Sequence, residues 1–249
     1  MLTRNEPNNP SAMAQGADAI VDGMVSPAEI DAALGENAAS PVQVLLSHAR
    51  RAFYDPQDVL YHQGNEIDTV FFVTGGLLKL VAHLPNGRAR IVRLHRPGSV
   101  LGLSGLRGQH NEHTAMAVTP VSALRVPLGA LQRLRTEYPT TYIGLAERWH
   151  DYLQDADTWI TKFSTGPIRG RVARLLAFLS NFEPNAAAGQ VQLLTCEEMG
   201  SILGVTSESV SRILADFKRQ HILARTSNTA SELYDTDMER LRHIGEDDE

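Results

Sequence analysis

Between residues 53 and 128, apolar and polar positions alternate in short runs that glycine or proline separates. Alternation with a period of two is typical of half-buried strands. Asn86-Gly87 lies between two of these runs and favours a tight hairpin in which both central residues have positive φ. Short antiparallel strands at this spacing predict a barrel or roll. The predicted strands are Val59–His62, Thr69–Val73, Leu77–His83, Ala89–Leu94, Thr114–Thr119 and Ser122–Pro127.

A helical period begins near Leu128, and its longest run extends from about Thr140 to Ser164. Apolar residues recur there at spacings of four and three, which is the heptad pattern of paired helices. The pattern predicts a dimer interface, and a core helix of a monomer is the alternative over so few heptads. Gly166-Pro167 ends this helix, and Ile168–Phe182 forms the next. The predicted interface residues are Tyr142, Ala146, Trp149, Leu153, Ala156, Ile160 and Phe163.

Residues 195–219 have the pattern of two short helices joined by a tight turn. Thr195 and Glu198 have the spacing of a capping box, and Gly204 suits a left-handed turn before a second cap at Thr206 or Ser207. This pattern predicts a helix-turn-helix, and an ordinary helical hairpin is the alternative. The apolar stripes consist of Met199, Ile202 and Leu203 on the first helix and Val210, Ile213, Leu214 and Phe217 on the second.

Polar side chains occupy the outer face of the second helix. Glu208 and Arg212 are four residues apart and therefore share a face. Arginine can bond guanine O6 and N7, and glutamate can accept from cytosine N4. We expect DNA base readout from Ser207, Glu208, Ser211 and Arg212, and DNA backbone contacts from Thr195, Thr206, Ser209 and Lys218. Ile222–Arg225 and Glu232–Tyr234 follow and predict a two-stranded wing.

The charge distribution is compatible with a DNA partner although the net charge is −6. Residues 166–226 contain 7 Lys and Arg against 5 Asp and Glu, whereas residues 227–249 contain 2 against 8. A few well-placed cations suffice for phosphate contacts. The chain has no run of 18 apolar residues and no secretory signal pattern, and its one cysteine excludes an internal disulfide. These features predict a cytoplasmic protein.

The patterns together predict an α+β chain of four parts. Residues 1–40 are rich in Ala, Asn, Pro, Gly and Ser, which favours a disordered or loosely held arm. Residues 41–137 form a β-roll sensor domain, which a short helix from Val42 to Arg51 introduces. Residues 138–165 form the dimerisation helix. Residues 166–249 form a winged helix-turn-helix domain with an acidic tail.

The chain resembles the CRP/FNR family of bacterial transcription regulators from about residue 50 to residue 242. The stretch "LTCEEMGSILGVTSESVSRILADFKRQHIL" is similar to the family's helix-turn-helix, and the glycine spacing in "VLYHQGNEIDTVFFVTGGLLKLVAHLPNGRARIVRLHRPGSVLG" is similar to its sensor domain. The resemblance implies a jelly-roll-like β-roll related to cyclic-nucleotide-binding domains, a homodimer and RNA polymerase as a partner. The turn glycines are Gly64, Gly76, Gly87, Gly98 and Gly102.

The second helix resembles the FNR branch, whose pattern is Glu-x-x-Ser-Arg. This resemblance implies a palindrome with half-sites like TTGAT, in which Glu208 and Arg212 read the G·C pair and Ser211 contacts a thymine. Members of the cAMP-receptor branch have an arginine before the glutamate, where this chain has Ser207. FNR itself senses oxygen through an iron–sulfur cluster held by N-terminal cysteines, which are absent here.

The candidate effector pocket consists of Gly102, Leu103, Arg107, His113 and Thr114. The family's nucleotide pocket has a glutamate at the position of Leu103 and an arginine at that of His113. Losing such charge-assisted bonds costs ~1.5–3 kcal/mol each. These differences argue against cAMP binding, although Arg107 could supply a displaced phosphate contact. A cyclic-nucleotide-responsive regulator with an altered pocket is therefore the alternative to an FNR-like one.

Other chemistry has weaker support. No cofactor or metal is predicted, and haem ligation by His83, His95, His110 or His113 is an alternative without a motif. Cys196 begins the first helix of the motif, where a helix N-terminus favours a thiolate, so oxidation could block DNA binding. A passive small residue is the alternative for Cys196. Motifs of hydrolases, nucleotide-binding loops and metalloenzymes are absent, so no enzyme is expected.

Overall fold

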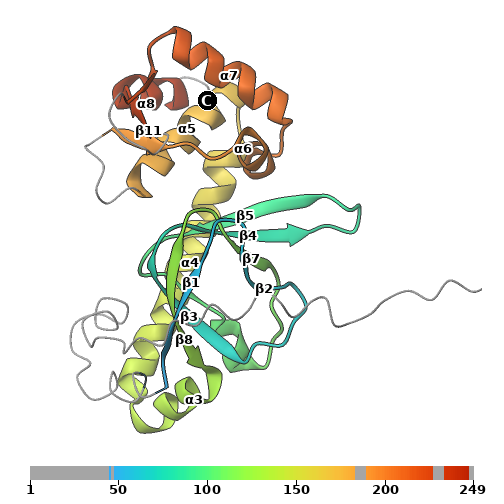
Figure 1. Cartoon of the computed structure of the whole chain (residues 1–249), viewed down its shortest axis with the longest axis vertical. Helices are drawn as coiled ribbons and strands as arrows, with labels where there is room; N and C mark the ends of the chain where they lie inside the picture. The colour runs from blue at the N-terminus through green and yellow to red at the C-terminus, as the bar shows by residue number, and fades with distance from the viewer. Residues whose placement is uncertain (1–44, 46–47, 183–188, 227–232, 247–249) are drawn as a thin grey trace, which may run out of the picture. The chain divides into compact units, whose positions relative to one another are not determined.

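The computed structural model describes residue 45 and residues 48–182, 189–226 and 233–246 (Figure 1), with backbone alone for residues 141, 144–155 and 182. The arm predicted at residues 1–40 lies outside this range. Contacts divide the chain into two units. The first contains residues up to 78 and residues 97–136, and the second contains residues 79–96 and 137–249.

Two sheets build the β-roll. One has the strand order β1-β8-β3-β6, and its paired strands are antiparallel. The other has the order β2-β7-β4-β5. A short 3₁₀ helix η2 (Leu103–Arg107) and helix α3 (Leu128–Glu137) belong to the first unit. The strands are β1 (Arg50–Tyr54), β2 (Val59–Tyr61), β3 (Thr69–Gly75), β4 (Leu78–His83), β5 (Ala89–His95), β6 (Val100–Leu101), β7 (Thr114–Ala117) and β8 (Val121–Pro127).

The alternating pattern places the core of the roll. Val70, Ala123, Leu124 and Val126 on the paired strands β3 and β8 are fully buried. Gly76 has a φ of 80°, and a Cβ there would lie 2.1 Å from the carbonyl oxygen of Pro120. The sequence therefore requires glycine at this turn. All five predicted turn glycines have positive φ.

The six predicted strands are present, but two others were not expected. The predicted helix from Val42 to Arg51 is wrong at its end, because Arg50 and Arg51 begin strand β1 and pair with β8. The rest of that helix falls largely on residues that the structure does not describe. Strand β6 has only two residues, too few to show alternation.

The hairpin between β4 and β5 is present, but its turn differs from the prediction. Gly87 has a φ of 78°, whereas Asn86 is not among the described non-glycine residues with positive φ. Leu84 instead pairs with both Gly87 and Arg88 through backbone bonds of 2.9 and 2.8 Å. The longer loop removes the need for a second residue with positive φ.

The second unit contains β5, all of β4 except Leu78, and the helical part of the chain. The elements of that helical part are α4 (Pro139–Ser164), α5 (Ile168–Leu179), η3 (Ser180–Phe182), β9 (Gln190–Gln192), α6 (Cys196–Leu203), α7 (Ser207–Arg219), β10 (Leu223–Arg225), β11 (Leu233–Thr236) and α8 (Met238–Glu246). The predicted wing is a three-stranded sheet rather than a two-stranded one, because β9 pairs with β11. Helix α8 was not predicted as an element.

The described side chains of α4 have two different environments. Ile143 and Ile160 are 56% and 60% exposed. Phe163 is fully buried and packs at 5.0 Å from Trp159 and at 5.4 Å from Phe178 of α5, measured between ring centroids. The end of the predicted dimer interface is thus split, since Phe163 already packs within its own chain.

Candidate DNA-binding and effector sites

Helix α6 begins with the capping box that the sequence predicts. The Thr195 hydroxyl accepts a bond from the Glu198 amide at 3.1 Å, and the Glu198 carboxylate accepts one from the Thr195 amide at 3.0 Å. Two backbone donors that a helix start leaves without partners are thereby satisfied. The first turn of α6 is therefore held at a defined position.

The turn between α6 and α7 depends on two glycines. Gly204 ends α6 with a φ of 68°, in the left-handed region. The Val205 amide donates to the Gly200 carbonyl at 3.0 Å, and a Cβ on Gly200 would lie 2.8 Å from the Val205 carbonyl oxygen. The small residue within α6 therefore allows the chain to turn back directly into α7.

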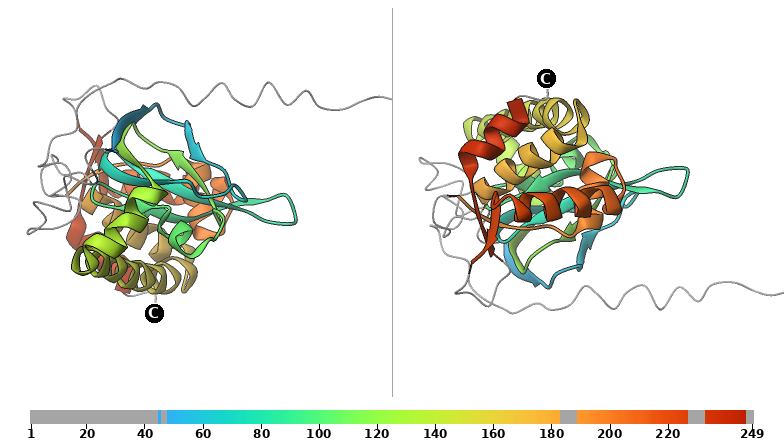
Figure 2. Two further views of the ribbon diagram at one scale, coloured as in Figure 1. Left: turned by 90° about the horizontal axis from the view of Figure 1, so that it is seen from below. Right: turned by 90° about the horizontal axis from the view of Figure 1, so that it is seen from above.

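Helix α7 presents the expected polar face outward. Its cap is Thr206, whose hydroxyl accepts from the Ser209 amide at 3.2 Å. Val210, Leu214 and Phe217 are buried on the inner side. Figure 2 (right) shows α7 lying across the face of this unit that is turned to the viewer. The four residues predicted to read bases, Ser207, Glu208, Ser211 and Arg212, are all exposed.

Glu208 and Arg212 lie together on this outer face. One Nη of Arg212 lies 2.5 Å from Oε1 of Glu208, and the two side chains are 72% and 77% exposed for Glu208 and Arg212 respectively. A pair this exposed contributes only ~0–1 kcal/mol to folding. Breaking this ion pair therefore costs little free energy, and both side chains are available to bond base edges instead.

The predicted backbone-contacting residues have mixed exposure. Thr195, Thr206 and Lys218 are exposed, whereas Ser209 is half-buried. Lys218 lies in the last turn of α7, with its Nζ 3.2 Å from the Tyr234 hydroxyl and 4.7 Å from the centre of that ring. Its ammonium is thus held by the wing beside the end of α7.

Sequence reasoning missed a support beneath α7. The Arg169 guanidinium on α5 forms an ion pair with Asp216 and lies 4.9 Å from the centre of the Phe217 ring. The hydrogen bond from Arg169 lowers the pKa of Asp216, so the carboxylate keeps its charge. No local pattern connects residues 47 positions apart, so the sequence held no signal for this pair.

None of the predicted effector residues lines one cavity of the first unit, which other side chains form. Leu103 and Thr114 are buried, His113 is half-buried and Arg107 is exposed. The Thr114 hydroxyl accepts a bond from the Gln63 amide at 3.1 Å. Gly102 has a φ of 87°, and a Cβ there would lie 2.7 Å from the Thr69 carbonyl oxygen.

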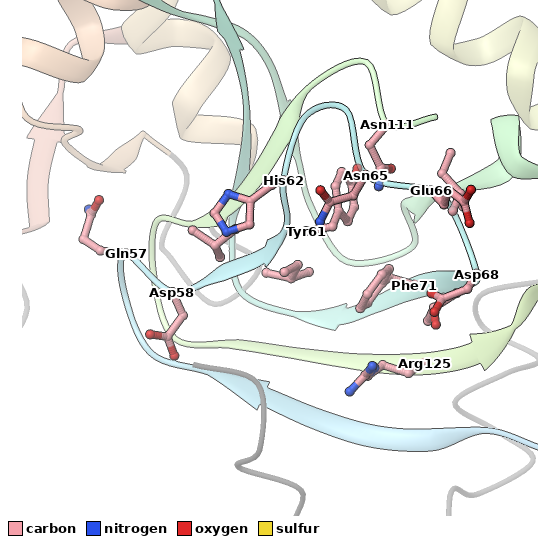
Figure 3. Close-up of a pocket in the computed structure, with 14 residues that line it drawn as sticks. Gln57, Asp58, Tyr61, His62, Asn65, Glu66, Asp68, Phe71, Asn111 and Arg125 are labelled. Carbon is pink, nitrogen blue, oxygen red and sulfur yellow. The ribbon is translucent and has the colours of Figure 1, made fainter. Parts of the chain in front are cut away.

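That cavity has a volume of about 480 Å³ and lies among β2, the segment after it and β3 (Figure 3). Tyr61 and Phe71 line it with ring centroids 5.8 Å apart, and Arg125 lies 5.9 Å from the Phe71 ring. Asn111 is buried at its edge. None of Gly102, Leu103, Arg107, His113 and Thr114 lines this cavity.

The remaining candidates from the sequence are Cys196 and the histidines. Cys196 is a free, half-buried cysteine at the first position of α6. Among the described residues, no three His, Cys, Asp or Glu side chains gather as a metal site would require. None of the described helices is both long and apolar enough to cross a membrane.

Two family models match the chain on either side of α4. The cyclic nucleotide-binding domain matches residues 51–138, and the Crp-like helix-turn-helix domain matches residues 170–244. The transcriptional activator protein Anr of Pseudomonas protegens is 27% identical over 170 residues, which cover 67% of this chain and 70% of Anr. The transcriptional regulator LdrP of Thermus thermophilus is also 27% identical, with 68% of this chain and 84% of LdrP covered.

A solved structure has the same fold. That of FixK2 from Bradyrhizobium japonicum superposes with a TM-score of 0.68 over 79% of this chain and 96% of FixK2, at 24% identity. The similar relatives are regulators rather than enzymes. The paired domain matches, the exposed polar face of α7 and these relatives identify the chain as a DNA-binding transcription regulator of the CRP/FNR family.

Proposed function

We propose that this regulator binds, as a homodimer, a palindrome of TTGAT-like half-sites. The observation that carries the proposal is the exposed Glu208–Arg212 pair in the first half of α7. Arg212 would bond guanine O6 and N7, Glu208 would accept from the paired cytosine N4, and Ser211 would contact a neighbouring thymine. Thr195, Thr206, Ser209 and Lys218 would contact the DNA backbone and set the register.

A palindrome requires two copies of α7 about one helical turn of DNA apart. Ile160 of α4 supports pairing along that helix, since it belongs to the heptad pattern and is 60% exposed, and an exposed apolar residue there favours a second apolar surface. RNA polymerase would be the further partner, and the DNA target would place the working protein in the bacterial cytoplasm.

Fluorescence anisotropy tests this proposal with two duplexes of the same length and composition. One carries inverted TTGAT half-sites about one helical turn apart, and the other carries the same bases scrambled. We expect the palindrome to bind at least ~10³-fold more tightly at moderate salt. Equal affinities would remove the specific readout, and a stoichiometry of one chain per palindrome would remove the dimer.

A cyclic-nucleotide-responsive regulator is the second candidate, and the match of residues 51–138 to a cyclic nucleotide-binding domain favours it. Against it, buried Leu103 cannot accept a bond from a ribose hydroxyl. Calorimetry of the full chain with cAMP and with cyclic di-GMP discriminates the two. Micromolar binding that raises DNA affinity would favour this second candidate.

A further inference from the structure

Lys79 is a buried lysine that lies far in sequence from the helix-turn-helix. It follows the first residue of β4, and only 6% of its surface is exposed. Its Nζ lies 2.7 Å from Oε1 of Glu198, and the two side chains are 8% and 11% exposed. Both residues belong to the second unit. Lysine and glutamate are almost never buried without a partner, so this pair depends on a specific arrangement.

The Glu198 carboxylate links Lys79 to the start of α6. While Oε1 accepts from Lys79, Oε2 accepts from both the amide and the hydroxyl of Thr195 at 3.0 Å. Burial alone would raise the pKa of Glu198, but the hydrogen bonds from Lys79 and Thr195 outweigh it and lower that pKa. The carboxylate is therefore charged near neutral pH and needs a cation beside it.

The β4–β5 hairpin also contacts α6 beyond its first turn. The Ile91 amide donates to the Ser201 hydroxyl at 2.9 Å, and that hydroxyl donates to the Ala89 carbonyl at 3.3 Å. A Cβ on Gly204 would lie 3.0 Å from an Nη of Arg90. Strand β4 thus holds the beginning of α6, while β5 contacts its middle and its end.

We propose that Lys79 is a positioning residue for DNA recognition. Through Glu198 it holds the first turn of α6, and thereby the orientation in which α7 meets the major groove. Only Gly204, Val205 and Thr206 separate the two helices, so a shift of α6 is passed to α7. Lys79 itself touches no phosphate, because its ammonium is buried against protein. The DNA part of this inference rests on the function proposed above.

Removing the ammonium leaves Glu198 as a buried charge without a partner, which is strongly unfavourable. The carboxylate then turns toward water and gives up its bonds to Thr195. The start of α6 loosens, and α7 samples orientations that do not fit the groove. Specific binding weakens, whereas binding to scrambled DNA, which does not need one orientation of α7, changes little.

The test compares the full-length protein with Lys79→Met by anisotropy on the palindrome and on scrambled duplex, over a range of salt concentrations. We expect palindrome affinity to fall about tenfold or more, with scrambled affinity unchanged. The slope of log affinity against log salt stays the same. A lysine that bound a phosphate would instead reduce that slope by ~0.9 on removal.

Matched variants separate positioning from a general loss of stability. Lys162→Met makes the same chemical change at an exposed site of α4, and we expect wild-type binding. Lys79→Arg retains the cation and restores most of the palindrome affinity. Glu198→Gln keeps an acceptor for Thr195 without the charge, so combining it with Lys79→Met adds no further loss. Should Lys79→Met fail to fold, Glu198→Gln and Lys79→Arg carry the same comparison.

Hydrogen exchange without DNA distinguishes failure of this inference from failure of the proposed site. If the wild type shows no preference for the palindrome, the proposed DNA site is wrong. The hydrogen exchange of the α6 amides then tests the role of Lys79 by itself. Amides of α6 that exchange at least about tenfold faster in Lys79→Met, with α5 unchanged, support it. Equal protection of α6, wild-type or tighter palindrome binding, or a reduced salt slope overturns it.

Discussion

The ion pair of Glu208 and Arg212 holds both side chains on the outer face of α7, where a base edge would meet them. Its exposure means that the pair is weak, so either group can leave it when DNA arrives. The buried side of the same helix, Val210, Leu214 and Phe217, fixes the helix rotation. The direction of the proposed reading groups therefore follows from the packing of residues on the inner side of the helix.

Arg212→Lys tests the reading role of a single side chain. Lysine keeps the charge but cannot form two parallel bonds to guanine. We expect the affinity for the palindrome to fall by about 1–3 kcal/mol, and most of the preference for guanine at that position to disappear. Binding of duplexes with each base at the guanine position, measured by competition, gives this preference directly.

Arg219→Lys is the matched control, because Arg219 is an exposed arginine at the other end of α7. A small loss that is equal for every sequence is expected there. If Arg212→Lys kept the wild-type preference for guanine, Arg212 would be a phosphate contact rather than a reading residue.

Among single residues, the sequence predicts the local arrangements and misses the distant ones. Glu208 and Arg212 are four apart, so helical geometry alone places them on one face. Thr195 and Glu198 are three apart, and their capping box is present. Lys79 lies 119 positions from Glu198. In a strand with alternating polarity, a polar residue such as Lys79 is expected to face outward. Nothing in the pattern shows that a distant residue covers it.

At the scale of elements, prediction succeeded where a periodic run is clear and failed where only the pairing with another strand determines the structure. Strand β1 contains Arg50 and Arg51, yet it is a strand because β8 supplies its backbone partners. Strand β9 has three residues, and its pairing with β11 could not be predicted from so short a run. The helix-turn-helix was predictable because caps, glycines and apolar stripes all indicate the same two helices.

The same substitution, glycine to alanine, should have different effects at Gly200, which lies against the α6–α7 turn, and at Gly129 in α3. Gly200→Ala would place a Cβ 2.8 Å from the Val205 carbonyl oxygen, on backbone that cannot move without displacing α7. We expect a loss of about 1–3 kcal/mol in unfolding free energy. In Gly129→Ala the Cβ meets nothing within 4 Å, so the change is neutral or stabilises by up to ~1 kcal/mol.

Urea unfolding followed by circular dichroism measures both variants, and anisotropy on the palindrome measures their binding. Gly200→Ala should weaken DNA binding as well as stability, because the start of α7 shifts. Similar effects of the two substitutions would mean that the turn has room for a side chain.

For the whole molecule, the decisive question is how many chains bind one site. Helix α4 has the heptad spacing of a paired helix, and its Ile160 is 60% exposed. Phe163, three residues on, is instead buried against α5. The heptad spacing thus includes Phe163, which packs within the chain, and Ile160, which is exposed and available to a second chain. Spacing alone could not tell these two cases apart.

Ile160→Asp tests this difference. A charge at an apolar helix–helix contact would be desolvated without a partner, so the proposed dimer should dissociate, whereas the monomer should keep its fold because Ile160 is 60% exposed. Sedimentation velocity should show the loss of the dimer, and palindrome affinity should fall toward that of a single half-site. Thr161→Asp makes the same change from a neutral to a negative side chain at the neighbouring exposed residue and should leave both unchanged. A dimer that persists in Ile160→Asp would show that the chains pair through another surface. Two chains would still be needed for the palindrome, because a single half-site contact cannot supply its specificity.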